Sequence, residues 1–372
     1  MLKRVAMVVV VLAVMSGTGF AQSTRITTIV GPPMPETGLP ALTQAIDYPS
    51  GIVADARGGF YVASTTQNRV YYVAANGALT LIAGTTYGFG GDGGRATAAR
   101  LAGPSGLALD AAGNLYISDT RNQRIRKVTA SGVITTFAGI GTAGFSGDGG
   151  AAAAAKLSGP SGLATDRAGN VYVADATNNR IRKITPAGII STVAGGGDMV
   201  VAGEPATQTT INTPNGVALD SRGNLYYSDA FMVRRVSVDG NVSTVVNSRF
   251  SGRGNSLCTF SGDEGPVSSA SICGPRGVSV DGSDNLYIVD RGSQRIRKVT
   301  TDGIIHTVAG NGSIRYSGDG GLAISAALSN PSAVATNANG NLYIADTTNN
   351  RIRRVGVDGV IRTSAGNGTA GE

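Results

Sequence analysis

Short apolar runs of three to six residues recur along the chain, and turns rich in Gly, Asp and Asn separate them. No long stretch has the apolar spacing of an amphipathic helix, whereas short β-branched runs between turn residues are typical of strands. Within residues 103–158 we predict four strands, named a to d in chain order: Leu107–Leu109, Leu115–Ser118, Arg124–Val128 and Val133–Ala138. Pro104-Ser105-Gly106 is predicted to be a turn before strand a. Four short strands joined by tight turns indicate one antiparallel meander.

This block occurs six times, near residues 48–102, 103–158, 159–212, 213–273, 274–329 and 330–372. Each copy has a proline before strand a: Pro49, Pro104, Pro160, Pro214, Pro275 and Pro331. A tyrosine lies twelve residues after each proline: Tyr61, Tyr116, Tyr172, Tyr226, Tyr287 and Tyr343. Because a fixed period indicates stacked repeats that share a core, we predict one domain over residues 22–372.

The copies share the pattern P-x-G-x-A-x-D-x-x-G-N-x-Y-[IV]-x-D-x-x-N-x-R-I, which is complete in Pro160–Ile181. This pattern resembles the NHL repeat, and the resemblance covers the chain from Tyr48 onward. It implies an all-β, six-bladed β-propeller of four-stranded antiparallel blades, with short linker insertions between blades. Residues 25–31 resemble a further strand d, and we expect Ile26–Val30 to pair in the blade of the last copy. The copies depart from the pattern locally: Ser64 replaces an Asp, Ala333 a Gly and Asn337 an Asp, and the fourth copy lacks the Asn.

The turn between strands b and c carries an aspartate and, five residues later, an arginine. Five copies have both: Asp119 and Arg124, Asp175 and Arg180, Asp229 and Arg234, Asp290 and Arg295, Asp346 and Arg351. The first copy has Ser64 and Arg69 instead. We expect each pair to form a charge-assisted bond that holds its turn, because a catalytic group is needed once rather than once per blade.

Three linkers between strand d and the next strand a contain a Gly-Asp-Gly segment with an aromatic residue before it, at Asp92, Asp148 and Asp319, and a fourth has a variant copy at Asp263. No GK[ST] follows, so a phosphate-binding P-loop is excluded. Each linker ends on an apolar residue three before the proline, which we expect to be buried: Ile46, Leu101, Leu157, Ile211, Ile272 and Leu328. Antiparallel strand order predicts one face, the linker face, that carries the linkers and the b–c turns. Its candidate binding residues are Phe89, Asp92, Phe145, Asp148, Phe260, Tyr316 and Asp319.

The N-terminus has the order of a secretory signal peptide: Lys3 and Arg4, an apolar run over Val5–Met15, then Gly19-Phe20-Ala21. We therefore expect residues 1–21 to be removed and the protein to be secreted or periplasmic; an uncleaved anchor is the alternative. Loss of Lys3 and Arg4 lowers the formal net charge from +7 to +5, and the remaining basic residues form no block, so we expect no nucleic-acid binding. The only cysteines, Cys258 and Cys273, lie in one linker and are predicted to form a disulfide, with two free thiols as the alternative.

We expect a monomeric, non-catalytic scaffold that binds a protein, glycan or small-molecule partner on the linker face, with no cofactor, no metal and no membrane span in the mature chain. The alternative is a lactonase- or lyase-like propeller enzyme with a metal in the central channel. That alternative needs His or carboxylate ligands on the inner strands. The one histidine, His306, is in a strand d, and Glu36, Glu204, Glu264 and Glu372 are in linkers or the tail.

Overall fold

The computed structural model describes residues 34–198, 203–248 and 260–370. These residues form six antiparallel sheets, and each sheet contains strands a to d of one repeat in the order a-b-c-d. No α-helix occurs in the described ranges, which have only short 3-10 turns besides the strands. No described helix is long and apolar enough to cross a membrane. The predicted six-bladed β-propeller is confirmed.

The strands of the first three blades have the following bounds. Blade 1 contains β1 (Pro49–Ala54), β2 (Phe60–Ser64), β3 (Arg69–Val73) and β4 (Leu79–Ala83). Blade 2 contains β5 (Pro104–Leu109), β6 (Leu115–Asp119), β7 (Arg124–Val128) and β8 (Ile134–Ala138). Blade 3 contains β9 (Pro160–Thr165), β10 (Val171–Asp175), β11 (Arg180–Ile184) and β12 (Ile190–Gly195).

The other three blades repeat this arrangement. Blade 4 contains β13 (Val217–Leu219), β14 (Leu225–Ser228), β15 (Met232–Val236) and β16 (Val242–Asn247). Blade 5 contains β18 (Pro275–Val280), β19 (Leu286–Asp290), β20 (Arg295–Val299) and β21 (Ile304–Ala309), and β17 (Gly265–Pro266) adds a fifth strand beside β21. Blade 6 contains β22 (Val334–Thr336), β23 (Leu342–Asp346), β24 (Arg351–Val355) and β25 (Ile361–Ala365).

In blades 1, 2, 3 and 5, strand a is longer than predicted, because the Pro-x-Gly segment before it is extended rather than a turn. In blade 2 the strand begins at Pro104, which pairs with Asp119, and the register shifts before Leu107. Consecutive blades approach closely at this irregular segment. A side-chain carbon added to Gly106 would overlap the carbonyl oxygen of Ser161 in the next blade. The predicted turn at Pro104–Gly106 was therefore wrong, since the glycine serves the contact between blades.

Gly106→Ala is expected to destabilise the protein by about 1–3 kcal/mol, the usual cost of overfilling a packed site. Gly282→Ala is the matched control, because Gly282 has open space around the position of an added side chain. Denaturant midpoints compare the two variants. Equal midpoints would show that the two blades can move apart at Gly106 without loss of stability, which would contradict the prediction.

A side chain at the end of the b–c turn links most blades to the next one. The last turn residue has a left-handed backbone and is Asn or Gln: Asn68, Gln123, Asn179, Gln294 and Asn350. Its side-chain oxygen accepts a hydrogen bond from the backbone N–H before the next proline, for example from Gly159 to Gln123 at 2.7 Å. The same bond occurs at Gly103, Thr213, Asn330 and Tyr48. We call these five bonds the interblade stitches.

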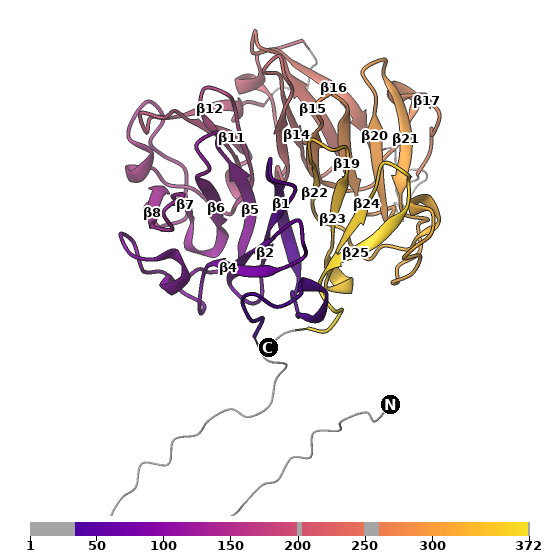
Figure 1. The fold of residues 1–372 in the computed structure, drawn as a ribbon. Coiled ribbons are helices and arrows are strands. Elements are labelled where there is room, and N and C mark those ends of the chain that lie inside the picture. Colours follow the sequence, from indigo (N-terminus) through magenta and orange to yellow (C-terminus); the bar gives the residue numbers. More distant parts are fainter. Residues whose placement is uncertain (1–33, 199–202, 249–259, 371–372) are drawn as a thin grey trace, which may run out of the picture. The chain divides into compact units, whose positions relative to one another are not determined.

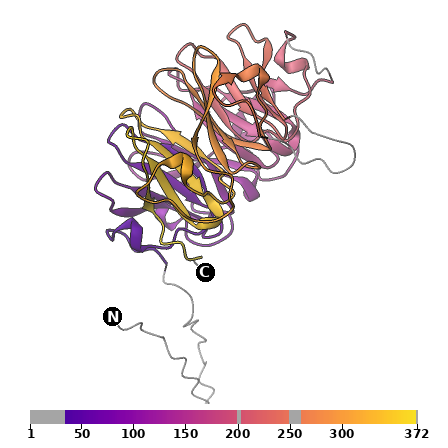
Figure 2. The ribbon, with the colours of Figure 1, turned by 90° about the vertical axis from the view of Figure 1, so that its right-hand side faces the viewer.

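The ring closes between the last and the first blade. β1 packs against β22 and β23 from the other end of the sequence, and the two colour extremes lie together in Figures 1 and 2. The stitch from Tyr48 to Asn350 crosses this junction at 2.9 Å. Blade 6 takes all four of its described strands from the last copy. The predicted closing strand, Ile26–Val30, lies outside the described residues.

Each linker wraps the outer side of the blade that follows it. In the linker before blade 3, the N–H of Gly149 donates to Ile190 of strand d, and that of Ala152 donates to Gly188 in the c–d turn. The prediction that the linkers lie on one face was therefore only partly correct, because they also reach the c–d turns. We keep the name linker face for the side with the b–c turns and the linker segments bonded to them.

The 3-10 turns occur in two places. Those in the linkers are η1 (Ala41–Thr43), η2 (Ala96–Ala98), η4 (Ala152–Ala154), η6 (Ala206–Gln208), η7 (Val267–Ser269) and η8 (Ala323–Ser325). Those in b–c turns are η3 (Thr120–Asn122), η5 (Ala176–Asn178) and η9 (Thr347–Asn349). After each linker turn comes the apolar residue predicted to be buried, and all six are at most 1% exposed: Ile46, Leu101, Leu157, Ile211, Ile272 and Leu328.

Candidate functional site

A charged cluster fastens each of four linkers to its blade. In blade 3 the buried Arg182 of β11 donates to Asp175 of the b–c turn at 3.2 Å and to Asp148 of the linker at 2.7 Å. The other carboxylate oxygen of Asp148 accepts from Thr192 of β12 at 2.6 Å. We call this set of two aspartates, one arginine and one threonine the linker clasp.

Burial dominates the electrostatics of the turn aspartate. The Asp175 side chain is fully buried and also accepts from the N–H of Ser158 and from Asn178. Burial raises its pKa, and the bonds from Asn178, Ser158 and Arg182 offset only part of that effect. The carboxylate therefore depends on all its partners to remain charged inside the fold.

The predicted partner of this aspartate was wrong. Arg180 lies opposite Asp175 in the strand ladder, but it donates to the carbonyl oxygen of Asn178 and stacks on Phe145 at 3.9 Å. Arg180 and Arg182 are two residues apart and point to the same side of the strand. Arg182 forms the ion pair with Asp175 because its guanidinium is fully buried and needs a counter-charge, whereas Arg180 lies nearer the surface.

Equivalent clasps occur in blades 2, 5 and 6. Their members are Asp92, Asp119, Arg126 and Thr136; Asp263, Asp290, Arg297 and Thr307; Asp319, Asp346, Arg353 and Thr363. The outer arginine of each pair, Arg124, Arg295 or Arg351, stacks on the linker aromatic instead. The predicted pairs at Asp119, Asp290 and Asp346 are corrected in the same way as that of blade 3.

Blades 1 and 4 have no clasp in their described residues. In blade 1, Ser64 donates to Gln67, and Tyr71 occupies the position of the buried arginine. In blade 4 the b–c turn is two residues shorter, so Arg234 aligns with the buried Arg182 rather than with Arg180. Arg234 donates to the carbonyl oxygen of Thr210, while Asp229 accepts from its own turn. The predicted pair of Asp229 and Arg234 was therefore wrong as well.

The four predicted linker aromatics are part of these assemblies. Each ring lies against two guanidinium groups; the rings are those of Phe89, Phe145, Phe260 and Tyr316. The distance from the ring centroid to the guanidinium carbon is 3.8–4.0 Å for the outer arginine, such as Arg180, and 4.5–4.9 Å for the buried arginine of the clasp, such as Arg182. Three of them, Phe89, Phe145 and Tyr316, still leave about two fifths of their surface exposed. The aspartates Asp92, Asp148 and Asp319, predicted as binding residues, are engaged inside the clasps.

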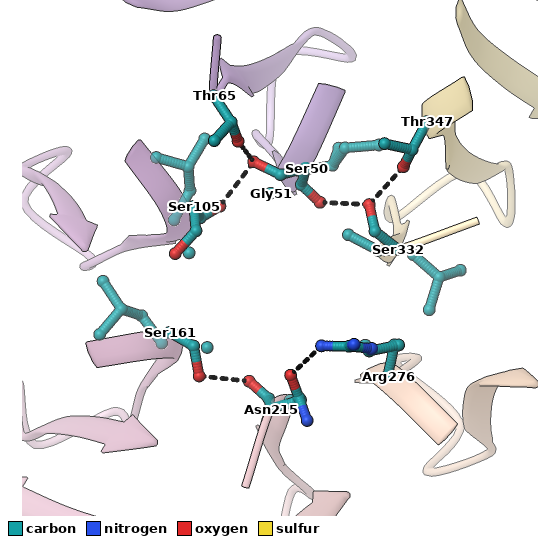
Figure 3. Close-up of a pocket in the computed structure, with 18 of the residues that line it drawn as sticks. Ser50, Gly51, Thr65, Ser105, Ser161, Asn215, Arg276, Ser332 and Thr347 are labelled. Carbon is teal, nitrogen blue, oxygen red and sulfur yellow. Dashed lines mark hydrogen bonds between the residues drawn. The ribbon is translucent and has the colours of Figure 1, made fainter. Parts of the chain in front are cut away.

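Sequence reasoning missed the residues that line the mouth of the central channel. Its mouth on the linker face is a cavity of about 340 Å³, lined by the residue after each proline: Ser50, Ser105, Ser161, Asn215, Arg276 and Ser332. Figure 3 shows these side chains from all six blades around one opening. The signal was present, since the Pro-x-Gly segments recur in the pattern, but their interpretation as turns hid it.

A belt of hydroxyl groups joins the blades around half of the mouth. Thr65, Thr120 and Thr347 each donate to the carbonyl oxygen of the proline in the next blade, at 2.8–2.9 Å. Blades 3, 4 and 5 have Ala176, Ala230 and Arg291 at this position. Further along strand a of each blade, six aliphatic side chains also line the cavity: Ile52, Leu107, Leu163, Val217, Val278 and Val334.

The described residues that line the cavity at the channel mouth include no Asp, Glu, His or Cys. In the ranges that the structure describes, no three such residues lie close enough to hold a metal ion. His306 is on β21 and contacts Glu264 at 2.9 Å, away from the channel lining. Cys258 lies outside the described residues, so its bridge to Cys273 stays a prediction.

The fold and the repeated clasp define the class of this protein: a six-bladed β-propeller built from NHL repeats. The chain belongs to the family of teneurin NHL domains, whose profile matches residues 88–146, 141–207, 252–317 and 313–370. It is 33% identical to Teneurin-3 of Mus musculus in an alignment 290 residues long that covers 67% of this chain and 10% of that protein. It is 30% identical to Teneurin-1 of Homo sapiens in an alignment 288 residues long that also covers 67% of this chain and 10% of the relative. The chain thus spans about a tenth of the length of these relatives.

Solved structures share the fold at low sequence identity. An auxiliary nutrient binding protein from Bacteroides thetaiotaomicron superposes with a TM-score of 0.59 at 15% identity, over 86% of this chain and 70% of that one. A putative gluconolactonase superposes with a TM-score of 0.52 at 15% identity, over 86% of this chain and 89% of that one. An inactive virginiamycin B lyase from Staphylococcus aureus, with quinupristin, superposes with a TM-score of 0.51 at 18% identity, over 87% of this chain and 86% of that one. At these identities the likeness concerns the fold alone.

Proposed function

We propose that this protein is a non-catalytic binding module that engages a partner through its linker face. The observation that carries the proposal is the set of exposed apolar side chains beside the b–c turns. They include Tyr48, Tyr87, Phe89, Ile140, Phe145, Ile314 and Tyr316. Rigid aromatic and aliphatic side chains on one face are typical of interfaces, because they bury apolar surface with little loss of conformational entropy.

The linker clasps support this role because they hold the displayed groups in place. Phe145 is stacked on Arg180 and Arg182, and Asp148 ties the same linker to its blade. A pre-ordered surface loses less entropy on binding than mobile loops do. The channel mouth supports the non-catalytic part of the proposal, since the described residues that line it offer no carboxylate or imidazole for acid–base chemistry.

We also propose that the partner is met outside the cytoplasm, because residues 1–21 have the order of a signal peptide. The partner is a protein, a glycan or a small molecule of that compartment.

The test compares two pairs of substitutions at equally exposed positions. Tyr87 and Ile314 are 61% and 66% exposed beside the b–c turns, whereas Val238 and Val357 are 66% and 81% exposed in c–d turns. The immobilised protein is incubated with the exported fraction of its source cells, and bound molecules are quantified by mass spectrometry. We expect Tyr87→Ser with Ile314→Ser to lose the bound partner, and Val238→Ser with Val357→Ser to keep it. Equal retention by both pairs would contradict the proposal.

A further inference from the structure

The junction between blades 4 and 5 differs from the other five. The b–c turn of blade 4 lacks the Asn or Gln that makes the interblade stitch, because only two residues separate Asp229 from Met232. The N–H of Gly274, the equivalent of the stitched donors, has no hydrogen-bond partner among the described residues. A hollow of about 450 Å³ lies at this point, lined by residues that include Gly274, Arg276, Arg291 and Asn330.

This hollow adjoins the mouth of the channel. Asn215, Arg276, Arg291 and Asn330 line both cavities. The guanidinium of Arg276 lies at the channel mouth and donates to Asn215 Oδ1 at 2.6 Å, as Figure 3 shows. Its other N–H groups have no partner in the described part of the chain. The side chain of Arg291 makes no hydrogen bond or ion pair there either.

Within the part of the chain that the structure describes, no carboxylate compensates the positive charge of the two arginines. The described residues that line the two cavities include no Asp or Glu. The carboxylates of the two b–c turns at this junction are engaged elsewhere: Asp290 accepts from the N–H of Cys273, and Asp229 accepts from its own turn. Residues 1–33, 199–202, 249–259 and 371–372 contribute one carboxylate side chain, Glu372. Burial, together with the like charge of Arg291, lowers the pKa of Arg276, yet a guanidinium stays protonated in proteins.

We propose that the junction of blades 4 and 5 binds the carboxylate of a small organic acid, whose apolar body lies in the channel. Arg276, Arg291 and the free N–H of Gly274 supply charge-assisted and neutral donors to one anionic group. The aliphatic ring that includes Val217 and Val278 provides the apolar surface beyond it. The volume suits a small ligand, and few polar groups at one end of an apolar cavity would fix its orientation. This inference is independent of the partner proposed for the linker face.

The repeats supply variants that the fold already accepts. Arg276→Ser introduces the residue that blades 1, 2, 3 and 6 have at this position, as in Ser161. Arg291→Thr introduces the residue of blades 1, 2 and 6, as in Thr120. Arg222→Ser is the control, because Arg222 is an exposed arginine in the a–b turn of blade 4, at the opposite end of the strands.

The experiment is a calorimetric titration of the whole protein with benzoate, and with benzamide, acetate and inorganic phosphate as comparison ligands. We expect one benzoate per chain, at least tenfold weaker binding of the other three ligands, and at least tenfold weaker benzoate binding by Arg276→Ser and by Arg291→Thr. Arg222→Ser is expected to bind as the unmodified protein does. Absence of benzoate binding, or binding unchanged in both channel variants, would overturn the site. Phosphate or acetate binding as tight as benzoate would overturn the proposed organic acid and leave a site for a simple anion.

Discussion

Asp175→Ala is expected to lower the free energy of unfolding by about 3–5 kcal/mol, because it leaves the buried Arg182 with one charged partner, Asp148, at the surface. The N–H of Ser158 and the amide of Asn178 lose their acceptor at the same time. The midpoint of denaturant unfolding measures the loss.

Arg180→Ala is the control for this prediction. Arg180 stacks on Phe145 and donates to one carbonyl oxygen, so its removal is expected to cost less than about 2 kcal/mol. A larger loss for Arg180→Ala than for Asp175→Ala would restore the pairing predicted from the sequence and refute the clasp.

Blade 1 offers a neutral version of the same cluster, which tests whether charge or fit is needed. In the b–c turn of blade 1, Ser64 is in the position of Asp175 and Gln67 in that of Asn178, and Tyr71 is in the position of the buried Arg182. Thr37 is in the position of the linker residue Asp148, and Leu81 is in that of Thr192. The corresponding variant of blade 3 combines Asp148→Thr, Asp175→Ser, Asn178→Gln, Arg182→Tyr and Thr192→Leu. We expect it to be more stable than Asp175→Ala, because no buried charge remains without a partner.

Leu157→Asp is expected to be the most damaging single substitution in a linker. Leu157 is fully buried among Ala138, Ala152, Ala155 and Ile190, between the linker and its two blades. Leu157→Ala should cost about 2–5 kcal/mol, the usual range for a buried leucine. Leu157→Asp should cost more, since it places an unpaired carboxylate in an apolar site.

The linker should loosen before the strands do. Amide exchange over residues 144–157 is expected to rise in Leu157→Ala, while β9 and β10 remain protected. Ile140→Ala, at a position of the same linker that is 41% exposed, is the control and should cost clearly less than Leu157→Ala. Unchanged exchange in the linker of Leu157→Ala would mean that other contacts hold this segment.

The strands and the buried linker residues could be predicted from the sequence because both follow a period. Strand c of blade 2 has the predicted bounds Arg124–Val128, and Leu101 and Leu157 are buried as expected. Hydrophobic burial depends on position in the repeat, and six copies show that position clearly. The choice of ion-pair partner does not follow from the period. Arg180 and Arg182 share one face of their strand, and only the three-dimensional position of Asp148 distinguishes them.

The channel site was hidden for a different reason. Arg276 and Arg291 depart from the repeat, and each looks like a single drifted position in the sequence. They become a pair because strand a and the b–c turn of blade 5 meet at the same end of the sheet, beside the shortened turn of blade 4. A search for patterns identifies residues that recur in every repeat, whereas a site that occurs once in a repeat protein is formed by residues that depart from the repeat.

Considered as a mechanical ring, the propeller has one joint that lacks the stitch of the other five and is held on the linker face by the bond from Arg276 to Asn215 instead. Blades 4 and 5 are tied at their a–b turns, where the N–H and the hydroxyl of Ser221 both donate to Asp284. On the linker face the same joint has no interblade stitch in the described residues. A small change of angle between these two blades would therefore widen or narrow the gap around Arg276 without breaking a strand pair. The predicted bridge between Cys258 and Cys273 would close a loop within the linker that joins these two blades.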